Sequence, residues 1–128
     1  MAIDALSIGV SALRMNETRV AVAADNIANA SNRTPLDPTA KPEGYTGYTP
    51  QRVSPVSLER GGVQATRQPV DPAYTAVADG RGGTDAMPNV DLAREFVEMT
   101  VASRAYEGAA SVIRTADDMQ ETLLDIIG

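Results

Sequence analysis

The longest stretch with regularly spaced apolar residues is NVDLAREFVEMTVASRAYEGAASVIRTADDMQETLLDII, residues 89–127. Two lines of residues seven positions apart run together along it, a spacing that predicts one long helix with a wide packing face. The first line is mostly large and the second mostly small: Met99, Tyr106, Ile113, Gln120 and Ile127, then Ala102, Ala109, Ala116 and Leu123. Asn89 is the expected N-cap, because its side chain can accept a hydrogen bond from a free backbone amide of the first turn.

A second helix is predicted over residues 3–30. Its apolar residues alternate in steps of three and four and so share one stripe. The stripe is Ile3, Leu6, Val10, Leu13, Val20, Ala24 and Ile27, interrupted only by Glu17. Ile8, Met15 and Val22 form a further line at spacing seven. The apolar surface is therefore wider than a two-helix seam needs.

Residues 31–88 differ from both helices, because they hold all eight prolines of the chain, and proline breaks long helices. A loop is expected over residues 31–44. A β-hairpin is expected within residues 48–67, where apolar and polar residues alternate around the turn pair Gly61-Gly62. Residues 73–77 are a candidate for one more short strand.

These elements predict a fold that is mainly α with a small β element. Long N- and C-terminal helices are expected to pair as an elongated coiled coil, with a loop and β-hairpin middle segment between them. The expected organisation is an N-terminal core helix (residues 1–30), a middle segment (31–88) and a C-terminal core helix (89–128).

The predicted helix lengths favour an assembly protein. At about 1.5 Å per residue the two helices are roughly 42 and 57 Å long. A compact chain of 128 residues has a diameter of only about 35–40 Å. The chain is therefore expected to be elongated, with other chains covering its surplus apolar faces.

Composition excludes several functions. The chain has no cysteine and no histidine, which removes thiol and histidine catalysis and Cys/His zinc sites. With no tryptophan, one phenylalanine and a formal charge of −6, it is not expected to bind nucleic acid. No apolar run approaches the roughly 20 residues that span a bilayer, so no membrane insertion is expected. The start of the sequence lacks the basic segment of a cleaved signal peptide.

Carboxylates are the remaining candidates for chemistry. Glu95 with Glu98, or Asp117 with Asp118, could form an acid–base pair, but among arginines on a long helix they are more typical of a solvated charged face. Residues 79–85, DGRGGTD, have the composition of a calcium loop, although an arginine stands where another acid would help, so an ordinary turn is favoured. We therefore expect no enzyme, no catalytic, metal-binding or cofactor-binding residues, and no cofactor.

One motif at each end of the chain resembles a known signature. Residues 24–30, ADNIANA, followed by Gly-Tyr pairs at 44–45 and 47–48, resemble the N-terminal signature of flagellar axial proteins, the family of rod, hook and junction proteins. Residues 87–99 and 102–107, MPNVDLAREFVEM and ASRAYE, are similar to its C-terminal signature, most of all in proximal rod proteins of the C type. The motif residues are Asn26, Ile27, Ala28, Asn29, Gly44, Tyr45, Pro88, Asn89, Val90, Asp91, Arg104 and Tyr106.

The resemblance implies a structural protein of the bacterial flagellum that serves motility. Such proteins are exported unfolded through the flagellar type III apparatus and self-assemble with other rod proteins in the periplasm, where the rod acts as a drive shaft. Their terminal helices pair as a coiled coil and form the inner core of a helical tube. One departure is Gly108-Ala109, where the family usually has Ala-Asn.

The predicted function is a subunit of the proximal rod of the flagellar basal body that polymerises through its terminal helices. The residues expected to pack helices and subunits are Leu6, Val10, Leu13, Val20 and Ile27, against Met99, Tyr106, Ile113, Leu123 and Ile127. Two alternatives stay open. One is another flagellar axial protein of the same family, and the other is a soluble coiled-coil adaptor that never polymerises.

Overall fold

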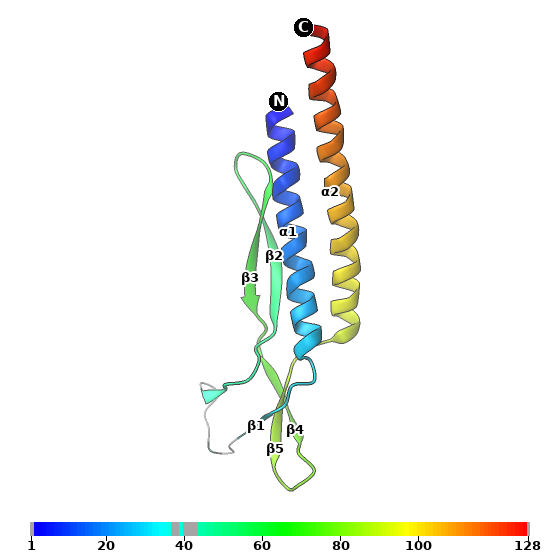
Figure 1. Ribbon diagram of the computed structural model, residues 1–128. Coiled ribbons are helices and arrows are strands. Elements are labelled where there is room, and N and C mark those ends of the chain that lie inside the picture. The colour runs from blue at the N-terminus through cyan, green and yellow to red at the C-terminus, as the bar shows by residue number, and fades with distance from the viewer. Residues whose placement is uncertain (1, 37–38, 40–43, 128) are drawn as a thin grey trace.

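The computed structural model describes residues 2–36, 39 and 44–127 and shows an elongated molecule (Figure 1). Two long helices, α1 (Ala2–Asn29) and α2 (Leu92–Ile127), lie side by side and run in opposite directions. The strands described between them are β1 (Thr34–Pro35), β2 (Gln51–Ser57), β3 (Val63–Pro69), β4 (Tyr74–Ala78) and β5 (Thr84–Pro88).

The strands form two antiparallel sheets. β2 and β3 make a hairpin that packs along α1, with Gln51 opposite Pro69 and Ser57 opposite Val63. β5 pairs with both the short β1 and β4, and this second sheet lies beyond the ends of the helices (Figure 1). The sheets therefore leave one side of the helix pair uncovered by strands.

Glycine and α1 together hold the turn between β2 and β3. Gly61 and Gly62 have φ angles of 84° and 91°, which glycine adopts without steric cost. The backbone N–H of Val63 donates a hydrogen bond to Ser11 Oγ over 3.1 Å. A Cβ on Gly62 would lie 2.6 Å from the same oxygen. The hairpin tip is therefore held closely against the first half of α1.

The predicted fold class is wrong in the middle of the chain. The expected loop over 31–44 contains β1, and β4 and β5 add a second sheet to the hairpin predicted within 48–67. The candidate strand at residues 73–77 corresponds to β4. Proline and glycine interrupt the alternation elsewhere in this segment, and β1 pairs with a strand far along the chain, so no local pattern indicated that three strands form a second sheet. Residues 37–38 and 40–43 of the expected loop lie outside the described residues, as does Gly128.

The predicted coiled coil is also not what the structure shows. A coiled coil interlocks large apolar residues of both helices, whereas the buried residues of α2 are Ala102, Ala109 and Ala116. Across the contact α1 presents Gly9 and Ala23, which are buried as well. Because the facing residues of both helices are small, the two backbones approach closely. The larger side chains lie at the edges of the contact.

The N-cap of α2 is Asp91, so the prediction that Asn89 caps this helix is wrong. Asp91 Oδ1 accepts a hydrogen bond from the backbone N–H of Arg94 over 3.2 Å, the geometry of an N-cap. Asn89 instead donates its Nδ2 to the carbonyl of Pro72 and its backbone N–H to that of Ala73. Aspartate suits the capping position because its charge complements the positive end of the helix dipole.

The end of α2 extends past α1. The helices have 28 and 36 residues, or about 42 and 54 Å. Gly9 lies opposite Ile113 and α1 begins at Ala2, so the turns of α2 beyond about Met119 lie past the start of α1 (Figure 1). We call residues 117–127, which comprise these turns and the few residues just before them, the α2 extension. All of its leucine, isoleucine and methionine side chains are more than half exposed.

Candidate assembly surface

Small residues bring α1 and α2 close together. A Cβ added to Gly9 would lie 2.7 Å from Cγ1 of Ile113, so any larger residue there would displace α2 or that isoleucine. Ala102 and Ala116 are 0% and 1% exposed. The helix contact therefore uses few large side chains and leaves many of them on the surface.

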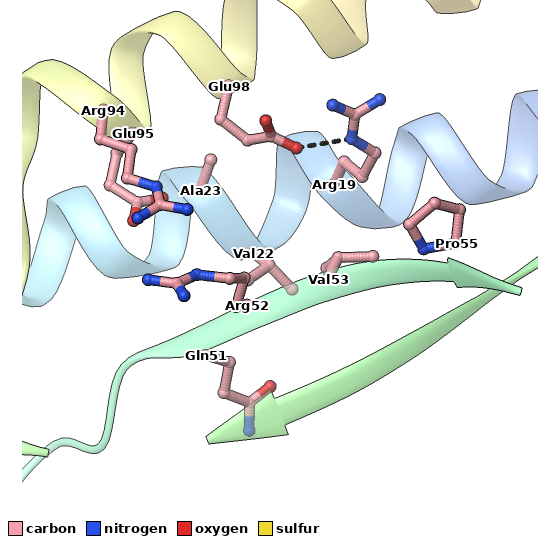
Figure 2. A pocket seen from close by; sticks show the side chains of 10 residues that line it. All are labelled: Arg19, Val22, Ala23, Gln51, Arg52, Val53, Pro55, Arg94, Glu95 and Glu98. Atoms are coloured by element: carbon pink, nitrogen blue, oxygen red, sulfur yellow. Dashed lines mark hydrogen bonds and ion pairs between the residues drawn. The ribbon is translucent and has the colours of Figure 1, made fainter. Parts of the chain in front are cut away.

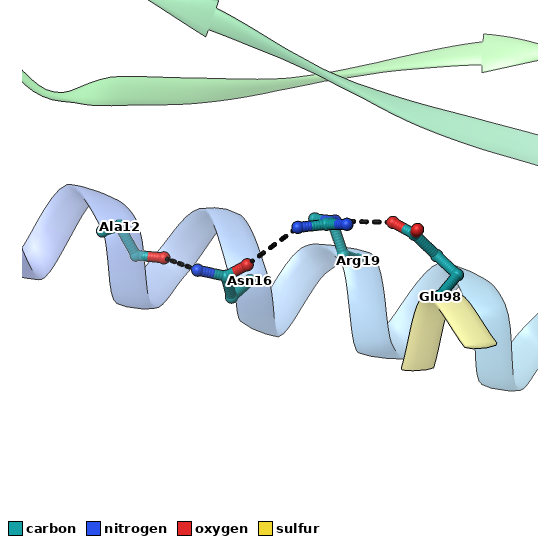
Figure 3. A network of polar contacts seen from close by, with 4 residues as sticks. All are labelled: Ala12, Asn16, Arg19 and Glu98. Atoms are coloured by element: carbon teal, nitrogen blue, oxygen red, sulfur yellow. Dashed lines mark hydrogen bonds and ion pairs between the residues drawn. The ribbon is translucent and has the colours of Figure 1, made fainter. Parts of the chain in front are cut away.

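A polar network crosses this contact (Figure 3). Asn16, only 3% exposed, donates Nδ2 to the Ala12 carbonyl over 2.9 Å and accepts from Arg19 at Oδ1 over 3.2 Å. Arg19 Nε in turn donates to Glu98 of α2 in an ion pair. No buried side-chain nitrogen or oxygen of the described residues lacks a partner. A fully paired polar group in a helix contact favours one register over others.

A second polar cluster joins the end of α1 to the start of β2. Asn26, 1% exposed, donates Nδ2 to the Gln51 carbonyl over 2.8 Å, and its Oδ1 accepts from the Gln51 N–H over 3.1 Å. The side-chain amide thus pairs with Gln51 as a neighbouring strand would. The Tyr48 hydroxyl donates to the same Oδ1 over 2.8 Å. This residue of the N-terminal motif therefore holds the middle segment to α1.

The two tyrosines of the Gly-Tyr pairs take part in this cluster. Burial raises the pKa of Tyr48 to about 12, and its hydrogen bond to Asp25 and that residue's charge act in the same direction. The Tyr45 hydroxyl donates to the Tyr48 carbonyl over 2.9 Å, and its ring lies 4.4 Å from that of Tyr74. Burial, and then the neighbouring Tyr74, raise the pKa of Tyr45.

The other motif residues divide into anchoring and exposed groups. Pro88 is buried, and Asn89 and Asp91 anchor the start of α2 as described above. Tyr106 is 43% exposed, and among the described residues Arg104 pairs only with Glu107 of its own helix. Ile27, Asn29 and Val90 are half-buried, and Ala28 and Gly44 are exposed.

The ten residues predicted to pack helices and subunits lie along both helices but are not equally buried. The half-buried ones are Val10, Leu13, Val20, Ile27, Met99 and Ile113, and the exposed ones are Leu6, Tyr106, Leu123 and Ile127. Some of them border an open groove of about 450 Å³ between the helices, lined by Glu17, Val20, Ala21, Ser103, Tyr106 and Glu107. Glu17, which interrupts the stripe in the sequence, therefore lies at a groove and not in the core.

An apolar line that sequence reasoning missed follows the outside of α2. It consists of Val97, Val101, Gly108, Val112, Met119 and Ile126, all exposed, and we call it the outer stripe. The residues recur at intervals of four and seven, so they share one side of the helix. A Cβ on Gly108 would meet no atom within 4 Å. A row of exposed apolar residues on one side of a helix is a candidate interaction surface.

Figure 2 shows a cleft of about 230 Å³ where α1, β2 and the start of α2 meet. Its lining combines apolar side chains such as Val22 with three arginines and two glutamates: Arg19, Arg52, Arg94, Glu95 and Glu98. Arg19 is paired with Glu98, whereas the guanidinium groups of the other two arginines make no hydrogen bond or ion pair with the described residues. We call this the arginine cleft.

The described residues contain no group of three or more His, Cys, Asp or Glu side chains arranged to hold a metal ion. In the candidate calcium loop, Asp79 Oδ1 accepts hydrogen bonds from the backbone N–H groups of Arg81 and Gly83, which lower the pKa of the Asp79 carboxyl. That carboxylate therefore organises the turn between β4 and β5. Neither described helix combines the length and apolar character needed to cross a membrane.

Sequence reasoning missed Gly9, Asn16 and Arg19, which shape the helix contact. A signal for two of them is present, because Gly9, Asn16 and Ala23 recur at spacing seven, like the alanine line of the other helix. The pattern of large apolar residues concealed it. Arg19 has no local signal, since its partner Glu98 lies 79 residues away.

A family model described as "Flagellar basal body rod FlgEFG protein C-terminal" matches residues 81–126 of the chain. The match covers β5 and nearly all of α2. It therefore includes the C-terminal motif, the alanine line and the outer stripe.

Three proteins named flagellar basal-body rod protein FlgC are similar along nearly the whole chain. The one from Agrobacterium fabrum is 29% identical over 135 residues, which cover 96% of this chain and 93% of that protein. The one from Yersinia enterocolitica is 30% identical over 125 residues, covering 91% of each chain. The one from Escherichia coli O157:H7 is 32% identical over 129 residues, again covering 91% of each.

Proposed function

This chain belongs to the flagellar basal-body rod proteins and is a structural subunit of the rod, and from that premise we propose that it polymerises through its helices into a torque-transmitting shaft. The FlgC proteins match along nearly all of its length, which supports a place among the proximal subunits. We assign residues 1–30 and 89–128 to the core of the polymer and residues 31–88 to its outer part.

The observation that carries this proposal is the apolar surface that one chain leaves uncovered. The outer stripe, the groove beside Tyr106 and the α2 extension are all exposed. Burying one large apolar side chain contributes about 1.5–3 kcal/mol. Covering several of them between neighbours would therefore favour a stiff polymer over separate chains.

The ten packing residues have two roles in this proposal. The half-buried ones support the contact between α1 and α2 from its edges. The four exposed ones, Leu6, Tyr106, Leu123 and Ile127, contact neighbouring subunits. The partners are copies of this chain and other rod proteins.

Family membership also supports the route by which the subunit reaches the rod. We propose export through the flagellar type III apparatus, followed by assembly in the periplasm. The rod family is structural, and no reaction is assigned to the chain.

Mass spectrometry of detergent-extracted hook–basal bodies tests the function. We expect peptides of this chain at a few copies per particle, and none in the same fraction from cells that lack flagellar export. A chain that is abundant in the cytosol and absent from purified basal bodies would contradict the proposal.

A further inference from the structure

We propose that the free edge of β4 is a strand-addition site, at which an extended segment of a different rod protein joins the second sheet by backbone hydrogen bonds. The inference rests on the proposed function, because it names one surface through which this subunit binds its neighbours. It concerns the middle segment and is separate from the contacts of the helices. Two features carry it: the backbone groups that β4 leaves unpaired, and the lack of protection along its edge.

β4 lies at the edge of the second sheet. The strand order is β1-β5-β4, so β5 pairs with one side of β4 and no described strand covers the other (Figure 1). The N–H of Asn89 donates to the carbonyl of Ala73 over 2.9 Å. This bond sets the alternation of the antiparallel ladder, so that Thr75 and Val77 also bond to β5. The N–H and C=O groups of the alternate residues point outward and have no partner among the described residues: these are Tyr74, Ala76 and Ala78.

The edge of β4 has none of the features that usually prevent strand addition. Proteins protect their edge strands with charged side chains, proline, β-bulges or a very short length. β4 reads YTAVA over five residues and pairs with β5 without a bulge. Thr75, Ala76 and Ala78 are exposed, and such small side chains leave the backbone accessible. Extended peptides bind to exposed edges of this kind by adding a strand.

The outer edges of the other described strands are protected. β1 has only two residues. The outward positions of β2 and β3 include prolines, which have no N–H to donate, an arginine, and backbone groups that bond to side chains of α1. The protecting residues are Pro35 at β1, Asn26 and Pro55 at β2, and Ser11, Arg67 and Pro69 at β3. Among the described strands, only β4 therefore presents an unprotected edge.

A different rod protein suits this edge better than a second copy does. Two β4 edges that face each other are related by a twofold rotation, and such a contact closes as a pair. A closed pair does not continue along a shaft. The other described strands of a copy have protected edges, as shown above. The rod family implies assembly with other rod proteins, and an extended segment of one of them would continue the sheet beyond β4.

Amide hydrogen exchange tests the pairing residue by residue. In the purified chain, the N–H groups of Thr75 and Val77 should exchange slowly because they bond to β5, whereas those of Ala76 and Ala78 should exchange fast. In purified hook–basal bodies, we expect all four to exchange slowly. Fast exchange at Ala76 and Ala78 in the basal body would mean that no strand is added there.

Photo-cross-linking identifies the occupant. With Thr75→p-benzoylphenylalanine, irradiation of purified basal bodies should link this chain to one segment of a different rod protein, which mass spectrometry of the adduct identifies. The matched control is Glu59→p-benzoylphenylalanine, which places the same probe on the exposed turn of the hairpin. We expect no link to that segment from it. A link from position 75 only to a second copy of this chain would contradict the proposal.

A proline substitution blocks the edge without breaking the sheet. Ala76→Pro removes an outward N–H and leaves the bonds to β5 in place, so it should lose incorporation into basal bodies. Ala76→Val is the matched control, because valine has a similar volume and keeps the N–H, and it should incorporate normally. Thermal unfolding of both purified variants verifies that each is folded. If the proline variant does not fold, exchange and cross-linking of the other chains decide.

The outcomes separate this site from the proposed function. Basal bodies that contain the unmodified chain, but show fast exchange at Ala76 and no adduct from position 75, would overturn strand addition and leave the function intact. Normal incorporation of Ala76→Pro would overturn it as well. If the unmodified chain is absent from basal bodies, the proposed function fails, and the strand-addition site fails with it.

Discussion

At the scale of single residues, Asn26 shows how a motif of the family acts in the fold. Its amide pairs with both backbone groups of Gln51 and accepts a third hydrogen bond from Tyr48. A side chain that can both donate and accept is required, because Gln51 offers one donor and one acceptor. The residue thus closes the start of β2 against α1 without leaving a buried polar group unpaired.

The substitution Asn26→Ala should lower the free energy of unfolding by about 2–4 kcal/mol. Each polar group left without its partner costs about 1–3 kcal/mol, and Asn26 pairs with more than one group. Urea unfolding of the purified chain measures this. Asn32→Ala is the matched control, because Asn32 is exposed and its side chain donates a hydrogen bond to that of Asn29 at the surface. Its effect should stay within about 0.5 kcal/mol, and equal losses from both variants would contradict the assigned role.

The raised pKa of Tyr48 predicts how the free energy of unfolding depends on pH. Its pKa of about 12 in the folded chain lies above the ordinary value near 10, so the folded state retains the proton longer than the unfolded state. The contribution of Tyr48 is therefore complete below about pH 10 and is lost as the pH rises through 10 toward 12. Urea unfolding at intervals over this range should show the decline.

The variant Tyr48→Phe removes the ionising hydroxyl. It should be less stable at pH 8, because the hydrogen bonds to Asn26 and Asp25 are lost, and its stability should fall less between pH 10 and 12. A decline as steep as that of the unmodified chain would show that other groups cause it. Tyr45 contributes in the same direction in both proteins, since burial raises its pKa as well.

At the scale of the elements, two helical glycines have opposite surroundings. Gly9 lies in the contact between α1 and α2, where an added Cβ would approach Ile113 to 2.7 Å. Gly108 lies on the outer stripe of α2 and faces open space. Glycine therefore permits close packing of the helices at position 9. At position 108 its effect within one chain is only to lower helix propensity.

The pair Gly9→Leu and Gly108→Leu tests this difference with one chemical change. Gly9→Leu should destabilise the purified chain by about 1–3 kcal/mol, because it overfills a tight contact. Gly108→Leu should stabilise the chain by up to about 1 kcal/mol through helix propensity. Thermal unfolding followed by circular dichroism distinguishes the two, and effects of the same sign would mean that the helices are not packed at Gly9.

At the scale of the whole molecule, a single chain leaves much of its apolar side-chain surface exposed. The hairpin covers one side of α1, and the second sheet lies beyond the helix ends (Figure 1). The outer stripe and the α2 extension are left exposed. The contact between the helices therefore relies on small residues and polar clusters, and many large apolar residues remain exposed.

Val112→Asp should therefore block incorporation into the basal body and abolish swimming, with little change in the stability of the purified chain. Val112 is 51% exposed at the centre of the outer stripe. Ser111→Asp places the same charge on the adjacent exposed position, outside the stripe, and should incorporate normally. Basal-body mass spectrometry and swimming assays measure the outcome, and normal assembly of the Val112 variant would place the subunit contacts elsewhere.

Residue patterns alone predicted the two long helices and the hairpin within residues 48–67, and two motifs indicated the family. Helices and hairpins are local structures, so residue spacing and turn glycines report them directly. The two motifs could be recognised because they lie in continuous segments, and the comparisons confirmed the flagellar rod family.

Contacts between distant segments establish which helix face is buried and how the strands of the middle segment pair, and residue patterns did not reveal either. Ala102 and Tyr106 belong to adjacent lines of equal regularity, and only contact with α1 shows that the alanine line is buried. β1 pairs with β5, and Asn26 with Gln51, across long stretches of chain, where no local spacing records the partner. The physical reason is the same in each case: periodicity reveals an element and its faces, but the neighbour that covers a face is set by contacts distant in sequence.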